Sequence, residues 1–116
     1  MDFERFEKVC RRAYGEASGT LFSLPDVLRV FERFFQRYEA ETGEDHPPIR
    51  CEQVRSIIEK MPSMIDAQGR EIVFIPDDYI CMIARYFDTE YQNCDYRINH
   101  FFSGMVREVK YYEVCY

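Results

Sequence analysis

The sequence predicts a mainly α fold, a compact bundle of about five helices with one small β-hairpin at about residues 64–75. The first observation is the run Tyr79–Phe87, in which only Arg85 is charged. A helix of this composition has almost no polar face, so we expect it at the centre of the bundle. Pro76 and two aspartates precede it as a start signal, which predicts a helix from about Asp78 to Glu90.

The second observation is a set of amphipathic stretches in the N-terminal half. One apolar stripe predicts a first helix over residues 2–14, ending near Gly15. Ser23 followed by Asp26 resembles a capping arrangement and predicts the start of a second helix, which stops by Gly43. The two stripes consist of Phe3, Phe6, Val9 or Cys10, and Ala13 or Tyr14, and of Leu24, Leu28, Phe31, Phe35 and Tyr38.

The middle of the chain contains the third observation, a glycine-bearing turn between apolar runs. Two prolines make residues 44–48 a connector, and a third helix is expected from about Arg50 to Met61, before Pro62. Its buried residues are expected to be Val54, Ile57, Ile58 and Met61. Met64 and Ile65, the turn 66–69 and the run 70–75 then indicate the hairpin.

The C-terminal segment has two possible structures. Asp95 is a plausible N-cap after a turn at Asn93–Asp95, and apolar residues recur at steps of four and three, which favours one continuous helix. Gly104 follows Ser103 inside this pattern, so the alternative is a helix that ends there and a strand over 105–116. The stripe of the continuous helix is Ile98, Phe102, Met105, Val109, Tyr112 and Tyr116.

Length and composition predict a single domain over 1–116, soluble and cytoplasmic. A chain of 116 residues with 47% hydrophobic residues can bury a core, and no run approaches the roughly 20 apolar residues of a membrane span. The N-terminus lacks the order of a secretion signal. The five cysteines are an odd number without Cys-x-x-Cys spacing, so we expect free thiols in a reducing compartment.

The net charge of −6 is unevenly distributed. Residues 15–46 hold seven acids against three bases, residues 63–78 hold four against one, and residues 95–116 are balanced. Nucleic-acid binding requires a basic footprint, whereas an acidic face suits a basic protein surface. The leading hypothesis is therefore a non-enzymatic acidic protein-interaction domain that binds, and regulates or inhibits, a protein with a basic surface. The partner-binding candidates are Glu39, Glu41, Glu44, Asp45, Asp66, Asp77, Asp78 and Tyr111.

The alternative hypothesis is a DNA-binding accessory protein of the helix-turn-helix or winged-helix kind. The central helix, a turn at 91–94 and the segment from Asp95 would form the two helices, with residues 65–75 as a displaced wing. Its DNA contacts would be Arg97, Asn99, His100, Arg107 and Lys110. The neutral charge of this segment weighs against it.

Two further kinds of site receive little support. Cys94 and His100 are the ingredients of a thiol enzyme, but their spacing of six exceeds one helical turn, so the side chains need not face each other. The acids between Glu39 and Asp45, with His46, match neither a calcium loop nor a zinc spacing. We expect no catalytic residues, no metal and no cofactor.

The run Cys94–Gly104, with the Tyr-Tyr-Glu near the end of the chain, resembles short uncharacterised proteins carried on mobile genetic elements of gut Firmicutes. The resemblance covers the last third of the chain and includes no motif of known chemistry. It implies a bacterial, element-borne protein, without an assigned activity or functional residues. The hypothetical partner is then a nucleic-acid-handling machine of the element or its host, as for an anti-defence inhibitor.

Overall fold

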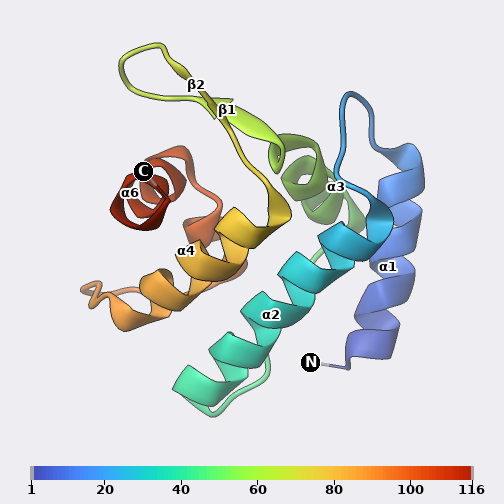
Figure 1. Cartoon of the computed structure of the whole chain (residues 1–116). Coiled ribbons are helices and arrows are strands. Elements are labelled where there is room, and N and C mark those ends of the chain that lie inside the picture. The colour runs from blue at the N-terminus through green and yellow to red at the C-terminus, as the bar shows by residue number, and fades with distance from the viewer. Residues whose placement is uncertain (1, 116) are drawn as a thin grey trace.

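The computed structural model describes residues 2–115, which form six helices and one two-stranded antiparallel sheet (Figure 1). The predicted mainly helical fold with one hairpin is confirmed. The elements are α1 (Phe3–Glu16), α2 (Leu24–Thr42), α3 (Cys51–Lys60), β1 (Ser63–Ile65), β2 (Glu71–Val73), α4 (Pro76–Asp88), α5 (Ile98–Phe101) and α6 (Gly104–Val114).

Helix α4 packs between α2 and α6. Pro76 stands in its first turn, where a missing N–H is tolerated, so the helix begins two residues before the predicted start. The predicted core helix is confirmed on most of its circumference by buried side chains, namely Tyr79, Met82, Ile83, Tyr86 and Phe87. Cys81 and Arg85 are exposed, so α4 also has one narrow solvent-facing side. This corrects the expectation that other elements surround the helix on all sides.

Helices α2 and α4 lie side by side and run in the same direction (Figure 1). Arg29 reaches Asp77 at 2.7 Å near their N-terminal ends, and Arg37 lies 3.5 Å from Asp88 near their C-terminal ends. Because the two helices are parallel, their carbonyl-rich C-terminal ends meet at one end of the molecule. This arrangement determines where the acidic residues gather.

Helices α1 and α3 pack against each other beside α2. The predicted stripe of α1 is confirmed by the burial of Phe6, Cys10 and Ala13, and Phe6 lies 4.9 Å from the Phe35 ring of α2. In α2, Ser23 accepts a hydrogen bond from the Asp26 N–H, and Gly43 ends the helix at φ 72°, as the sequence predicts.

The hairpin pairs Met64 with Ile72, and both of these side chains face the protein. On its other face Ile65 and Val73 are exposed. This alternation is what the period of two predicts for a sheet with one face in water. The hairpin stands at one end of the molecule, beside α6 (Figure 1).

The C-terminal segment is neither of the two structures that the sequence suggested. Asp95 is not an N-cap, because α5 begins only at Ile98 and lasts four residues. Ser103 then adopts an extended ψ of 149°, and its hydroxyl donates to the His100 carbonyl at 2.8 Å. This local hydrogen bond competes with the helical backbone, so the continuous helix breaks and α6 starts afresh at Gly104.

The break also changes which face of α6 is buried. Met105 is 78% exposed and Val109 is 46% exposed, although the predicted stripe placed both inside. The buried residues of α6 are Val106, Arg107 and Lys110. The last residue of the predicted stripe, Tyr116, lies outside the described residues.

Two substitutions test which side chains are buried on either side of the break at Ser103. Phe102→Ala removes a fully buried ring and is expected to lower the free energy of unfolding by about 3–5 kcal/mol. Met105→Gln replaces an exposed side chain by another good helix former and is expected to change it by less than about 0.5 kcal/mol. Urea denaturation followed by circular dichroism measures both. Comparable losses in the two variants would contradict this assignment, in which Phe102 is buried and Met105 is exposed.

Candidate functional site

Exposed carboxylates gather where the C-terminal ends of α2 and α4 meet. We name this surface the acidic end; its members are the exposed acids in the last turns of the two helices and in the residues that follow them, namely Glu39, Glu41, Glu44, Asp45, Asp88 and Glu90. Glu41 and Asp88 meet at Arg37, whereas Glu39 lies on the side of α2 that borders Phe3. Arg37 lies 3.2 Å from Glu41 and 3.5 Å from Asp88. The negative ends of two helix dipoles add to the carboxylate charge.

Other acids of the predicted acidic face lie elsewhere. Asp77 pairs with Arg29, and Asp78 accepts the Ile75 N–H at 2.8 Å, both at the N-terminal end of α4. Glu41 lies twelve positions after Arg29 in α2, so the two residues are about 18 Å apart along the helix axis at the usual rise. The predicted residues therefore do not form one continuous surface.

Asp66 is buried and belongs to the hairpin turn. Its carboxylate accepts the N–H groups of Gln68 and Arg70, the Arg70 Nε at 3.2 Å and the Tyr112 hydroxyl at 2.7 Å. The Tyr112 hydrogen bond is the main reason that the pKa of Asp66 is lowered. Asp66 thus fastens the hairpin to α6 and cannot bind a partner. Tyr111, another predicted contact, is half-buried with its ring 5.3 Å from Phe74.

The residues predicted to read DNA are largely unavailable to it. Arg107 is buried, donates to the Lys60 carbonyl and the Tyr79 hydroxyl, and holds its guanidinium 5.4 Å from the centre of the Phe74 ring. Lys110 is 2% exposed. Arg97 and Asn99 are exposed, but α5 is one turn long, which leaves no recognition helix at the predicted position.

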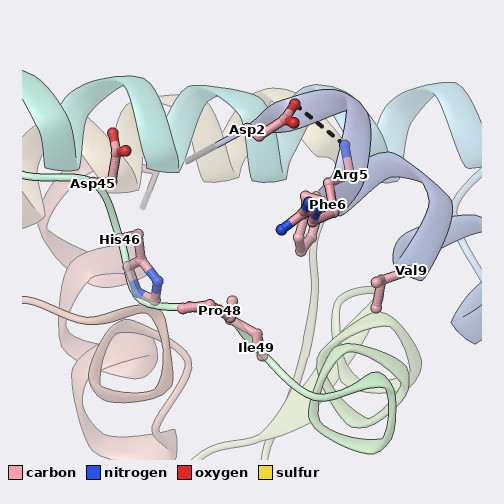
Figure 2. A pocket seen from close by; sticks show the side chains of 8 residues that line it. All are labelled: Asp2, Arg5, Phe6, Val9, Asp45, His46, Pro48 and Ile49. Carbon is pink, nitrogen blue, oxygen red and sulfur yellow. Dashed lines mark hydrogen bonds between the residues drawn. The ribbon is translucent and has the colours of Figure 1, made fainter.

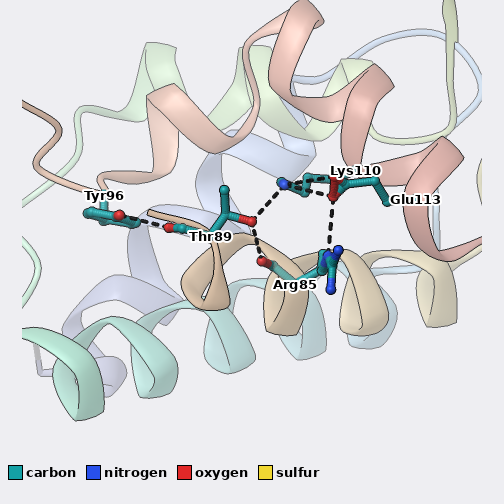
Figure 3. A network of polar contacts seen from close by, with 5 residues as sticks. All are labelled: Arg85, Thr89, Tyr96, Lys110 and Glu113. Carbon is teal, nitrogen blue, oxygen red and sulfur yellow. Dashed lines mark hydrogen bonds and ion pairs between the residues drawn. The ribbon is translucent and has the colours of Figure 1, made fainter. Parts of the chain in front are cut away.

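A polar network surrounds Lys110 (Figure 3). Its ammonium donates to Thr89 Oγ1 at 2.7 Å and to Glu113 Oε1 at 2.8 Å, and Arg85 Nε lies 3.3 Å from the same carboxylate oxygen. The Thr89 carbonyl accepts the Tyr96 hydroxyl at 2.8 Å. The hydrogen bond from Lys110 lowers the pKa of Glu113. The network joins α6 to the end of α4 and the following loop.

A hollow of about 280 Å³ borders the acidic end (Figure 2). Its lining combines apolar side chains with a few polar ones, and comprises Asp2, Arg5, Phe6, Val9, Asp45, His46, Pro48 and Ile49. Asp2 caps α1 at its edge by accepting the Glu4 N–H at 3.1 Å. The hollow has room for one apolar side chain of a partner.

His46 forms the inner wall of this hollow and is 5% exposed. Its Nδ1 lies 2.8 Å from the Pro47 carbonyl, and its Nε2 accepts the Ile98 N–H at 3.1 Å. Nδ1 therefore carries the proton of a neutral imidazole. Burial lowers the pKa of His46. This histidine links the connector 44–48 to α5. Within residues 2–115, no three His, Cys, Asp or Glu side chains could hold a metal ion together.

The structure brings Cys94 and His100 together, although their spacing suggested otherwise. Cys94 Sγ lies 3.4 Å from His100 Nδ1, and the Tyr86 hydroxyl lies 2.8 Å from the same nitrogen. The sequence argument assumed a helix between the two residues. Instead, Cys94 lies in a loop whose residues Asn93 and Tyr96 have φ values of 53° and 56°, and the loop turns the thiol back towards α5.

Comparisons with models of known protein families, with curated proteins and with solved structures each gave no match. Across residues 2–115, no helix combines the length and the apolar character that crossing a membrane requires.

Glu113→Gln tests the Lys110 network. The buried ammonium loses its ionic partner, but Glu113 itself is exposed and screened by water, so the expected loss in the free energy of unfolding is about 1 kcal/mol at pH 7. Because the folded protein holds Glu113 at a lowered pKa, this contribution is present above the ordinary value of 4.5 and is lost as the pH falls through the folded value. Denaturation of both proteins at pH 7 and at low pH measures it, with the exposed Glu71→Gln as control. An equal loss in the control would contradict the assignment.

His46→Gln tests the neutral histidine. The unfolded chain takes up the proton near the ordinary value of 6.5, whereas the folded chain resists it, so wild-type stability falls as the pH drops below about 6.5. Glutamine does not titrate, and the variant lacks this part of the decline. Subtracting the two stability curves between pH 8 and pH 5 isolates the effect, because His100 is present in both. A constant difference would show that His46 is not held neutral.

Proposed function

We propose that this chain is a non-enzymatic protein-binding domain that docks its acidic end on a basic surface of a protein partner. The observation that carries the proposal is the convergence of exposed carboxylates on the C-terminal ends of two parallel helices. Arg37 is placed between Glu41 and Asp88, so it holds part of the surface in a fixed arrangement. Such a surface favours a complementary positive patch and accelerates its approach at low salt.

The neighbouring hollow gives the interface an apolar anchor point. Phe6, Val9, Pro48 and Ile49 supply apolar lining, and Asp45 belongs both to the hollow and to the acidic end. Interfaces commonly concentrate their affinity in one buried side chain surrounded by polar contacts. The partner segment that fits this chemistry has an apolar side chain flanked by lysine or arginine residues.

Basic surfaces of this kind are typical of proteins that handle nucleic acids. By occupying such a surface, the domain competes with the phosphate backbone and thereby regulates or inhibits its partner. The resemblance of the C-terminal third to proteins of mobile genetic elements supports a partner that belongs to the element or to its host. Steric and electrostatic competition requires no catalytic residue in this chain.

A pull-down from cells that make the protein tests the acidic end by comparing variants of equal net charge. The test variant is Glu39→Lys with Glu44→Lys, and its matched control is Glu52→Lys with Glu71→Lys, at exposed positions outside the acidic end. We expect wild type and control to retain the same salt-sensitive protein and the test variant to bind it at least about tenfold more weakly, a loss of about 1.4 kcal/mol.

A third variant tests the apolar lining of the hollow separately from the carboxylates of the acidic end. Ile49→Ser polarises the hollow and is expected to weaken binding of the same protein without changing the salt dependence. Quantitative binding at two salt concentrations measures both effects once the captured protein is purified. Equal retention by the test variant, or an equal loss in the control, would rule out docking through the acidic end.

A further inference from the structure

The loop between α4 and α5 places a thiol, an imidazole and a phenol within reach of one another. We name the side chains of Tyr86, Cys94 and His100 the thiol cluster. His100 Nδ1 lies 3.4 Å from Cys94 Sγ and 2.8 Å from the Tyr86 oxygen, and the Tyr86 oxygen lies 4.0 Å from the sulfur. A nucleophile, a base within reach and a third group that orients the base are the usual ingredients of an activated thiol.

Tyr96 holds the loop in the shape that this geometry requires. Its hydroxyl donates to the Thr89 carbonyl and accepts the Tyr91 N–H, each at 2.8 Å. Its ring lies 5.5 Å from the Tyr86 ring of α4, so both the ring and the hydroxyl of Tyr96 have fixed contacts. The Tyr96 backbone N–H then donates to Cys94 Sγ at 3.3 Å. The sulfur is thus held in place by the backbone and faces His100.

The proton arrangement around His100 permits two states. In the tautomer that carries its proton on Nε2, Nδ1 offers one lone pair, and the Tyr86 hydroxyl, at 2.8 Å, donates to it while Cys94 keeps its proton. When the thiol proton moves to Nδ1, the imidazolium N–H faces the sulfur and the Tyr86 hydroxyl is released to donate to it as well. Burial raises the pKa of Tyr86, so the phenol keeps its proton. The thiolate is then surrounded by donors from the Tyr96 backbone, His100 and Tyr86.

The sulfur is also accessible to a small molecule. Cys94 is half-buried and borders a surface hollow of about 350 Å³. The lining is mainly polar and comprises Tyr91, Gln92, Asn93, Cys94, Asp95, Tyr96, Arg97 and His100. This composition suits a small, polar reagent with charged groups of both signs.

The other thiols lack this combination. Burial raises the pKa of Cys10 to about 12 and that of Cys115 to about 12, so both remain protonated. Cys81 is exposed on α4. The chain has two histidines; His46 is bound to Pro47 and Ile98, and His100 to Cys94 and Tyr86. Neither Cys81 nor the half-buried Cys51 therefore has an imidazole to accept its proton.

We propose that Cys94 is a nucleophilic thiol that forms a reversible mixed disulfide with small polar disulfides. The thiol proton moves to His100 Nδ1, and the thiolate attacks one sulfur of the disulfide. A new bond forms between Cys94 Sγ and that sulfur while the original S–S bond breaks, and the departing thiolate takes the proton from His100. The exchange conserves the oxidation level overall and needs no further oxidant. It is a modification site separate from the partner docking proposed above.

The native full-length protein at pH 7 is treated with excess oxidised glutathione, and each cysteine is followed by peptide mass mapping over time. We expect Cys94 to be modified at least about tenfold faster than Cys81, although Cys81 is the more exposed thiol. Exposure alone predicts the opposite order. Modification of Cys81 at the same rate as Cys94, or faster, would overturn the proposal.

His100→Gln separates activation from accessibility. The variant is expected to slow Cys94 by about tenfold and to leave the rate of Cys81 unchanged, which also controls for folding. In the wild type, the Cys94 rate should decline less steeply than the Cys81 rate between pH 8 and pH 6, a comparison that needs no variant. A Cys94 rate insensitive to His100→Gln, together with parallel pH profiles, would show an ordinary thiol.

Discussion

Two cations on one face of α6, Arg107 and Lys110, are withdrawn from water, and the arrangement of the C-terminal half depends on how they are satisfied. A buried charge without partners costs several kcal/mol, so each must meet hydrogen-bond acceptors, most of which belong to other elements. Arg107 bonds to the last residue of α3 and to Tyr79, and Lys110 bonds to Thr89 and Glu113. These bonds fix the rotation of α6 about its axis and its position against α3 and α4.

The same burial shapes the electrostatics of the surface. Residues 95–116 carry equal numbers of acids and bases, but two of the three cations are inside. The exterior is therefore more acidic than the sequence suggests for this segment, and the DNA hypothesis loses the residues that would neutralise phosphate. Meanwhile, the parallel packing of α2 and α4 brings together acids that are far apart in the chain, such as Glu41 and Asp88. The acidic end follows from helix direction as much as from composition.

Sequence patterns predicted the elements whose periodicity is local. The spacing of apolar residues along the sequence predicts the buried stripes of α1 to α4 and the alternation of the hairpin. The structure contains these elements, with their ends shifted by a few residues. The pattern failed where one side chain competed with the backbone, at Ser103, and where polar residues took core positions, at Arg107 and Lys110. A positive charge in an amphipathic pattern is normally evidence for the solvent face, so no periodicity argument could find those two. Cys94 and His100 were considered as a pair, but their contact could not be predicted, because it depends on left-handed residues in a loop.

Thr89 connects these observations. Its backbone ends α4, its carbonyl accepts Tyr96, and its hydroxyl donates to the Arg85 carbonyl while it accepts Lys110. The buried cation of α6 therefore binds the residue at which α4 stops and the loop begins. The residue before Thr89, Asp88, pairs with Arg37 at the acidic end, and in the loop after it the Tyr96 N–H holds the Cys94 sulfur near His100. The two proposed surfaces thus flank a residue that a buried ammonium binds, which is a contact that hydrophobic patterning alone does not express.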